Sequence, residues 1–472
     1  MDASLFPRAV CRFVGRIAFS TALPILPNAA AAAKPSISAG TSFIPLQPLI
    51  HRKTHRLEAR AQLYRDSDVG PTVLPWPPSD ATAPFKKELT RQNPLPSVPP
   101  AVGRPLSPLP QHHRRLSTHR SGPKHESFFP RTGAPFDFAA GCHPVDHPHP
   151  PFVYHPEYTC PSWPSVHRFK MWKFAALHRH LIEQQGVSRD CFFIPPELPE
   201  AWLMMVHEPG YVGAFIEGTL DPMKLRRIGF PWSPPLVRRT LLEVSGTILT
   251  AQLAVEFGLA CNLGGGTHHA HWDWGSGFTI FNDLAVAAKV IQQQKRANKI
   301  LIVDLDVHQG DGTAALFAND PSVFTLSFHC EKNFPFRKQK SDLDVSFAAG
   351  TGDEQFLDTL RRVLPSLLSS ERPDLVLYDA GVDVWAGDKL GELQISERGL
   401  ADRDRFVIET CMDAHVPVAC VIGGGYDDDR HKLAARHAIV HKVASSVWVE
   451  REPWKAFGHK RHELRHSEAA HV

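Results

Sequence analysis

Residues 301–312, LIVDLDVHQGDG, predict both a buried strand and a metal site. The first half is apolar and β-branched, which is typical of a parallel strand that is buried on both faces. Asp304, Asp306 and His308 follow at alternate positions, so we expect their side chains to share one face of an extended strand. Unpaired charges are costly in a packed core, and a bound cation would compensate them. The pattern therefore predicts a metal site where the strand ends.

Length and composition point to one large domain with an added segment. The chain has 472 residues, and its net charge of +3 gives no field that would favour nucleic acid or a membrane surface. Its eight cysteines include no C-x-x-C pair, which argues against a disulfide framework or a zinc ribbon and for a reducing compartment. No apolar run reaches about 18 residues, so we expect no transmembrane helix.

The N-terminal region differs from the rest. Residues 1–56 contain a single acid and place Arg8, Arg12 and Arg16 on one side of a helical wheel, which is typical of an organelle transit peptide. We expect import into the mitochondrion, with the plastid as the alternative. If this segment is only a disordered terminus, the nucleus or cytoplasm becomes the expected location.

Proline marks the next boundary, because 24 of the 42 prolines lie in residues 1–150. Residues 57–150 predict a proline-rich disordered linker, and residues 451–472 predict a basic tail. The linker ends in a cluster of Cys and His side chains without ligand spacing, which we interpret as a solvated tract rather than a metal site. These are Cys142, His143, His147 and His149.

Residues 151–450 alternate between strand-like and helix-like segments after two helical stretches, 166–185 and 236–257. This alternation predicts an α/β fold with a single parallel sheet and helices on both faces. The predicted strands are 259–263, 300–305, 323–328, 375–378 and 417–422. The predicted helices that follow are 283–296, 354–369, 397–414 and 430–448.

Four of these strands end in polar or glycine-rich runs. Because ligands bind at the carboxyl ends of parallel strands, the runs predict one shared crevice. They are GGGTHHAH after Leu263, DVHQGDG after Leu305, DAGVDVWAGD after Tyr378 and GGGYDDD after Ile422.

Within this crevice Asp306, His308 and Asp383 are candidate ligands for Zn²⁺, with Fe²⁺ as the alternative. Two carboxylates and one imidazole leave positions open for water and substrate, whereas a structural zinc usually closes its fourth position with Cys. A metal in such a site acidifies bound water and polarises a carbonyl. The sequence therefore favours a hydrolytic metal centre.

Other polar groups of the crevice suggest acid–base chemistry. His268 and His269 are candidate proton-transfer groups, although adjacent histidines are also common on surfaces. Asp304 and Asp311 can orient them by accepting an outer N–H. Tyr426 can donate its hydroxyl to a developing oxyanion, although an ordinary half-buried tyrosine is the alternative.

These motifs resemble a known family. GGGTHHAHWDWGSGFTIFND (264–283), VDLDVHQGDG (303–312), YDAGVDVWAGD (378–388) and IGGGYDDD (422–429) are similar to the zinc-dependent histone deacetylases, in particular the class IV branch and its bacterial relatives. The resemblance runs from about residue 151 to about residue 446. It implies the arginase/deacetylase fold.

The resemblance also implies roles for individual residues. Zinc would be bound by Asp306, His308 and Asp383, with the histidine pair as general acid and base and Tyr426 at the acyl oxygen. Gly277, Phe278 and Gly424 resemble the substrate-binding wall of the acyl-lysine tunnel. Arg168 resembles an arginine at the acetate exit. A structural potassium ion would be bound by Asp304, Asp306, His308 and Ser327.

Two segments depart from the family pattern. In HCEKNFPFRKQKSDLD (329–344) either Phe334 or Phe336 would line the rim of the tunnel. The aromatic HWDW segment (271–274) could narrow or reshape the mouth. Both departures bear on which substrate is accepted rather than on the chemistry.

The sequence therefore predicts a metal-dependent amidohydrolase that removes acetyl or longer acyl groups from lysine side chains of proteins or peptides. One alternative keeps the fold and acts on a small acylated amine such as an acetylpolyamine. Another is a catalytically idle module that binds acyl-lysine. A ureohydrolase is disfavoured because it would need a second set of Asp and His ligands. We expect no direct binding to nucleic acid or membrane.

Overall fold

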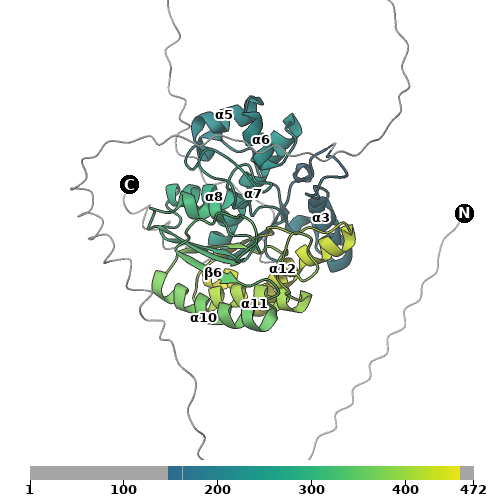
Figure 1. The fold of residues 1–472 in the computed structure, drawn as a ribbon. Coiled ribbons are helices and arrows are strands. Elements are labelled where there is room, and N and C mark those ends of the chain that lie inside the picture. Colours follow the sequence, from purple (N-terminus) through teal and green to yellow (C-terminus); the bar gives the residue numbers. More distant parts are fainter. Residues whose placement is uncertain (1–146, 162, 458–472) are drawn as a thin grey trace, which may run out of the picture. The chain divides into compact units, whose positions relative to one another are not determined.

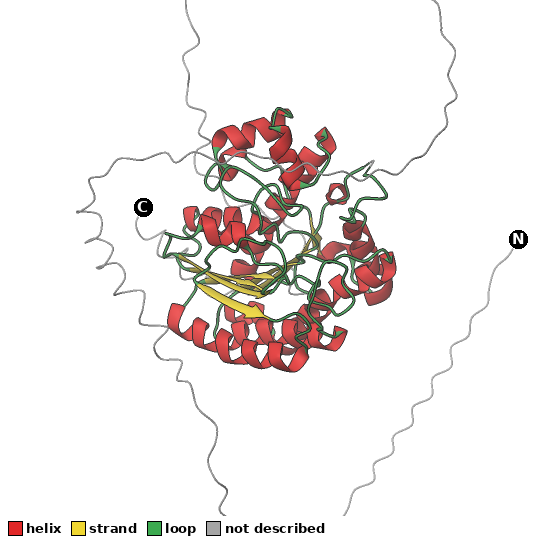
Figure 2. Cartoon of the chain, in the orientation of Figure 1, coloured by secondary structure: helices red, strands yellow, loops and turns green. Residues whose placement is uncertain are grey.

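One parallel sheet forms the centre of the fold. The computed structural model describes residues 147–161 and 163–457, and Figure 2 shows the sheet of these residues in yellow. Its neighbouring strands follow the order β2-β1-β3-β8-β7-β4-β5-β6. The strands are β1 (Phe152–Val153), β2 (Phe192–Phe193), β3 (Leu259–Asn262), β4 (Ile300–Asp304), β5 (Val323–Cys330), β6 (Leu343–Phe347), β7 (Leu375–Asp379) and β8 (Val418–Val421).

Helices cover both faces of the sheet (Figure 1), with α7 and α8 on one face and α10 and α11 on the other. The helices are α3 (Lys173–Gln185), α4 (Glu200–Leu203), α5 (Pro209–Glu217), α6 (Pro222–Ile228), α7 (Pro234–Phe257), α8 (Asp283–Gln293), α9 (Asp311–Leu316), α10 (Asp353–Glu371), α11 (Glu397–Asp413), α12 (Arg430–Arg451) and α13 (Pro453–Phe457). Among the described residues, no helix is both long and apolar enough to cross a membrane.

Capping side chains set where the principal helices begin. Ser233 accepts a hydrogen bond from the backbone N–H of Leu236 and precedes two prolines at the start of α7. Asn282 caps α8 in the same way, by accepting from the N–H of Ala285. Asp429 caps α12. Each capping residue lies one position before its helix, so the same side chain ends the preceding loop and sets the first residue of the helix.

The predicted α/β fold with one parallel sheet and helices on both faces is confirmed. The five predicted strands appear as β3, β4, β5, β7 and β8, and the predicted later helices appear as α8, α10, α11 and α12. The sequence did not indicate β1 and β2, because two residues are too few to show a period. It also missed β6, an edge strand whose side chains are mostly half-buried.

The predicted helix over residues 166–185 begins only at Lys173. The backbone before it is held by side chains instead, because His167 Nδ1 accepts from the N–H of Phe169 at 3.0 Å and Trp163 Nε1 donates to the carbonyl of Phe169 at 3.0 Å. These bonds compete with helical hydrogen bonding. Phe169 is buried all the same, which explains the apolar spacing.

The predicted transit peptide and most of the predicted linker lie outside the described residues. The last linker residues, 147–150, pack against α12, since the carbonyl of His147 accepts from Trp448 Nε1 at 3.1 Å and His149 Nδ1 lies 2.8 Å from Ser445 Oγ. At the other end α12 and α13 extend into the predicted basic tail, of which residues 458–472 are not described.

The polar runs meet because their strands are neighbours. β3, β8, β7 and β4 are consecutive in the sheet, and all four run in the same direction. Their carboxyl ends therefore lie along one edge, where the loops that carry the candidate residues begin. Arg403 of α11 is fully buried and links two of these loops, because it donates to the carbonyls of Leu305, Ala380 and Gly381.

A valine pair tests where the core lies. Val303 in β4 is fully buried and Val449 in α12 is 56% exposed. Replacing Val303 with Ala should lower the free energy of unfolding by about 2–3 kcal/mol, because two buried methyl groups are lost and a cavity remains. Val449→Ala, the matched control, should change it by less than about 0.5 kcal/mol. Equal effects in urea denaturation would contradict the placement of β4 in the core.

Candidate active site

The structure brings together the three residues that the sequence suggested as metal ligands. One ligand atom from each of Asp306, His308 and Asp383 lies within 4.8 Å of the others, and all three residues are buried. His308 Nδ1 is 3.0 Å from Asp306 Oδ1 and 3.2 Å from Asp383 Oδ2. Two buried carboxylates beside one imidazole leave negative charge uncompensated, which fits a divalent cation.

The expectation that Asp304, Asp306 and His308 share one face of an extended strand is wrong. β4 ends at Asp304, and the chain then turns. Asp304 Oδ1 accepts from the N–H of Asp306 at 3.1 Å, and Asp306 Oδ1 accepts from the N–H of His308 at 2.9 Å. These local bonds favour a turn over a strand. Asp304 consequently faces a histidine rather than the metal group.

Backbone groups hold the ligands in place. The N–H of Gly424 donates to Asp306 Oδ2 at 2.8 Å, and the N–H of Val307 donates to Asp383 Oδ1 at 2.9 Å. Gly424 must be glycine here, since a Cβ atom would lie 2.0 Å from Asp383 Oδ2. The absence of a side chain at Gly424 therefore lets the loop after β8 approach the two carboxylates. Gly424 also lines the cavity.

His268 and His269 lie directly above the metal group, each with its own carboxylate. His268 Nδ1 is 2.7 Å from Asp304 Oδ2, and His269 Nδ1 is 2.6 Å from Asp311 Oδ1. These contacts assign the Nδ1 proton to both rings. Their Nε2 atoms are 3.1 Å apart, so one of them must carry a proton that the other accepts.

Electrostatics decides which ring is charged. Burial lowers the pKa of His268, but the charges of Asp304 and Asp306 outweigh it and raise the pKa well above its usual value. Burial and the charge of His268 lower the pKa of His269 to about 4. In this arrangement His268 carries the charge, and its Nε2–H donates to the neutral Nε2 of His269.

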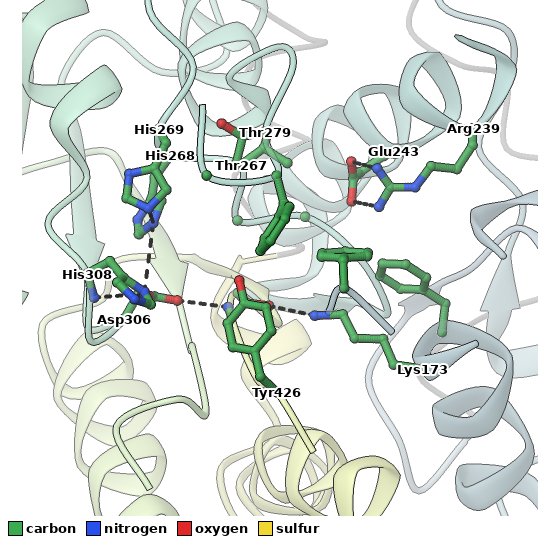
Figure 3. A pocket seen from close by; sticks show the side chains of 18 residues that line it. Lys173, Arg239, Glu243, Thr267, His268, His269, Thr279, Asp306, His308 and Tyr426 are labelled. Atoms are coloured by element: carbon green, nitrogen blue, oxygen red, sulfur yellow. Dashed lines mark hydrogen bonds and ion pairs between the residues drawn. The ribbon is translucent and has the colours of Figure 1, made fainter. Parts of the chain in front are cut away.

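Tyr426 faces the same cavity, and Figure 3 shows it between the histidine side and the lysine side. Burial, followed by the charges of Asp383 and Asp306, raises the pKa of Tyr426 well above its usual value. The phenol therefore stays protonated and can donate a hydrogen bond. The N–H of Tyr426 donates to Asp388 Oδ2 at 2.7 Å, which fixes the backbone behind the ring.

Aromatic rings line the cavity and pack against its histidines. Phe278 lines it, and the ring of Phe334 lies 4.8 Å edge-on from that of His269. Phe336 is 88% exposed, so of the two phenylalanines it is Phe334 that lies against the site. Gly277 has φ 55°, and a Cβ there would lie 2.6 Å from His269, so glycine is required at this turn. The HWDW segment lines no part of the cavity.

The inner end of the cavity is basic. Lys173 is buried and donates to the carbonyl of Gly423 at 3.1 Å, and burial lowers its pKa to about 8. Arg239 and Glu243 form a buried ion pair beside it (Figure 3). Arg168, expected at an acetate exit, is exposed and does not line the cavity. The turn before α3 directs Phe169 inward and Arg168 to solvent, whereas Lys173 lines the cavity.

The sequence also gave no role to Asp379, the last residue of β7. It is fully buried beside Asp304 in register, its Oδ2 is 3.9 Å from His268 Nδ1, and both its oxygens lack a hydrogen-bond partner. Burial and the charge of Asp304 raise the pKa of Asp379 well above its usual value. An acid directly after a buried strand was the signal for this residue.

Comparison with known proteins identifies the family. The profile of the histone deacetylase domain matches residues 167–441, which span all four strand-end loops. The chain belongs to the histone deacetylase family. It is accordingly an amide-hydrolysing deacetylase of a metal-dependent family, and the buried Asp and His group is suited to the metal.

Relatives of this deacetylase include bacterial and plant proteins. An uncharacterized protein of Picosynechococcus sp. is 56% identical over 299 residues, covering 63% of this chain and 99% of that protein. Histone deacetylase 2 of Arabidopsis thaliana is 29% identical over 273 residues, covering 55% and 70%. The acetoin utilization protein AcuC of Staphylococcus aureus is 26% identical over 285 residues, covering 55% and 73%. The crystal structure of the HDA15 HD domain shares the fold, with a TM-score of 0.52 and 21% identity over 66% of this chain and 99% of that one.

A glycine substitution tests the metal group of this deacetylase. Gly424→Ala should lower the amount of metal that co-purifies, because the new Cβ would displace both Asp383 and Asp306. Elemental analysis of the purified protein measures this. Gly213→Ala in α5, whose Cβ would meet nothing within 4 Å, is the control. Unchanged metal content in Gly424→Ala would exclude Asp306 and Asp383 as the ligands.

Proposed function

We propose that the protein removes acetyl or longer acyl groups from lysine side chains of proteins. The observation that carries the proposal is the convergence of a neutral His269 Nε2, a protonated Tyr426 and the Asp306–His308–Asp383 group on one cavity. Phe278 lines this cavity and the ring of Phe334 packs edge-on against His269, and both rings suit the apolar stem of an acyl-lysine. A long narrow side chain could thus place its amide at the metal group.

The residues of the chain divide the work of amide hydrolysis. We propose Zn²⁺ as the cation held by Asp306, His308 and Asp383, where it would supply Lewis acidity and acidify a water molecule. His269 accepts the proton of the attacking water at Nε2, and Asp311 fixes the ring and stabilises its charged form. Tyr426 donates its hydroxyl to the developing oxyanion. His268, held charged by Asp304, stabilises negative charge and can protonate the leaving amine.

A structural potassium ion is proposed near the metal group. Ser327 of β5 pairs in register with Asp304 of β4, so its hydroxyl lies beside the turn that carries Asp306 and His308. Ser327 Oγ also lies 3.1 Å from His329 Nδ1. Main-chain carbonyls of the turn together with this hydroxyl would provide the oxygen ligands that a monovalent cation needs.

Substitutions in the full-length chain test the assigned roles. Tyr426→Phe should lower kcat on an acetyl-lysine peptide by roughly 10²–10³-fold with little change in KM, because one oxyanion donor is lost. Asp306→Ala should abolish both turnover and metal binding, because it removes a ligand. Thermal unfolding of each variant controls for misfolding. Full activity in either variant would contradict the assigned roles.

A substrate panel separates this function from the alternatives. Acetyl-lysine peptides, longer acyl-lysine peptides and acetylpolyamines are compared by kcat/KM. Preference for the acetylpolyamines would favour a small-molecule deacylase. Tight binding of acyl-lysine without any turnover would indicate an idle binding module, although such a module has no need of the hydroxyl of Tyr426. Relatives named both histone deacetylase and acetoin utilization protein leave protein and small-molecule substrates open.

We further propose that residues 1–56 direct import into an organelle, and that the mitochondrion is the destination. The arginines on one helical side and the near-absence of acids support this proposal. A fluorescent reporter fused behind residues 1–60 should co-localise with a mitochondrial marker, and plastid fluorescence would establish the alternative. A diffuse signal in the cytosol or nucleus would refute import.

A further inference from the structure

Asp311 contacts a second histidine that the proposed mechanism does not use. Its Oδ1 faces His269 Nδ1 at 2.6 Å, and its Oδ2 faces His271 Nε2 at 3.0 Å. Asp311 is 3% exposed and His271 is 6% exposed, so neither group is hydrated from outside. Each oxygen of the carboxylate therefore has one imidazole as its partner.

The imidazole ring of His271 is held in place by a neighbouring tryptophan. Its ring stacks on Trp274 with centroids 3.7 Å apart and an angle of 14°. The guanidinium of Arg227 lies 4.4 Å from the centroid of the Trp274 ring. The N–H of His271 donates to the carbonyl of Trp274 at 2.8 Å, so the segment folds back on itself. Trp274 of the HWDW segment thus supports His271, and the segment does not line the cavity.

The backbone of His271 is fixed by another buried histidine. His207 Nε2 accepts from the N–H of Asn282 at 2.9 Å, so the ring proton must lie on Nδ1. His207 Nδ1 accordingly donates to the carbonyl of His271 at 2.8 Å. Burial lowers the pKa of His207 to about 4, which keeps this tautomer neutral. His271 is thus fixed through both its main chain and its side chain.

A carboxylate with two anchored partners cannot rotate freely. The terminal torsion of an aspartate is broad, so a single hydrogen bond would leave the plane of Asp311 poorly defined. With His271 on Oδ2, the plane is set and Oδ1 points at His269 in one direction. Because outer hydrogen-bond partners set the orientation of the ring they contact, the direction of His269 Nε2 depends on His271.

We propose that His271 is a positioning residue for the deacylation reaction, acting through Asp311 to aim His269. This inference rests on the proposed function only for its kinetic test. His271→Phe keeps an aromatic ring against Trp274 but removes the donor to Asp311. His271→Gln removes the ring but keeps an N–H donor.

Kinetics of the full-length variants test the donor role. His271→Phe should lower kcat on the preferred acyl substrate by about 10–100-fold, with KM and metal content unchanged. His271→Gln should recover most of that loss. Trp272→Ala, whose side chain is 49% exposed beside His271, is the control and should leave kcat unchanged. Adding His271→Phe to Asp311→Asn should lower kcat no further than Asp311→Asn alone, because His271 acts on His269 only through Asp311.

Spectroscopy keeps the inference testable without turnover. Nuclear magnetic resonance of the protein with ¹⁵N-labelled histidine should show a downfield Nδ1 proton for His269, identified by its loss in His269→Phe. His271→Phe should shift this resonance and Trp272→Ala should not. An unshifted resonance, wild-type kcat in His271→Phe, or equal losses in His271→Phe and His271→Gln would overturn the inference. Absence of turnover by the unmodified protein would instead refute the proposed function alone.

Discussion

The site depends on how four buried carboxylates are compensated at the ends of two neighbouring strands. Asp304 ends β4 and Asp306 follows it, while Asp379 ends β7 and Asp383 follows it, and each is no more than 2% exposed. Negative charges that are close together and buried away from water lower the stability of the fold unless cations or hydrogen-bond donors face them. His268 and the backbone N–H groups of the turns face Asp304, Asp306 and Asp383, whereas both oxygens of Asp379 lack a hydrogen-bond partner. A metal ion held by Asp306, His308 and Asp383 would add to this compensation. The rest of the fold can be understood as the means of holding these groups together.

The sheet holds these groups together because it places β3, β8, β7 and β4 side by side. Each strand delivers one loop to the same edge, so imidazoles, carboxylates and a phenol converge although up to 158 positions separate them, as between His268 and Tyr426. Arg403 ties the loops after β4 and β7 through their carbonyls, with Asp404 beside it at 2.8 Å. Glycines at the turns, such as Gly424, permit the close approach. Rigid strand ends thereby give the loops the precision that hydrolysis demands.

Residues behind the cavity wall hold the side chains that line the cavity. Asp304 and Asp311 hold the histidine pair, and a further layer that includes His271 and His207 holds Asp311. Lys173 and the Arg239–Glu243 pair also line the cavity. The cavity lining thus combines aromatic rings, the histidines and metal-group residues, and buried charged side chains.

The sequence by itself determined the parallel α/β fold and the composition of the site. Alternating apolar segments identified β3, β4, β5, β7 and β8, and polar runs after four of them indicated one crevice, because both signals are local. The sequence did not determine which way the side chain of Asp304 points, because the turn after β4 sets that direction. It also did not determine that Arg168 is exposed. Lys173 and His271 acquired their places only in the tertiary structure, since an isolated lysine or histidine has no pattern. Contacts between residues distant in the chain decided those roles, and no periodicity records such contacts.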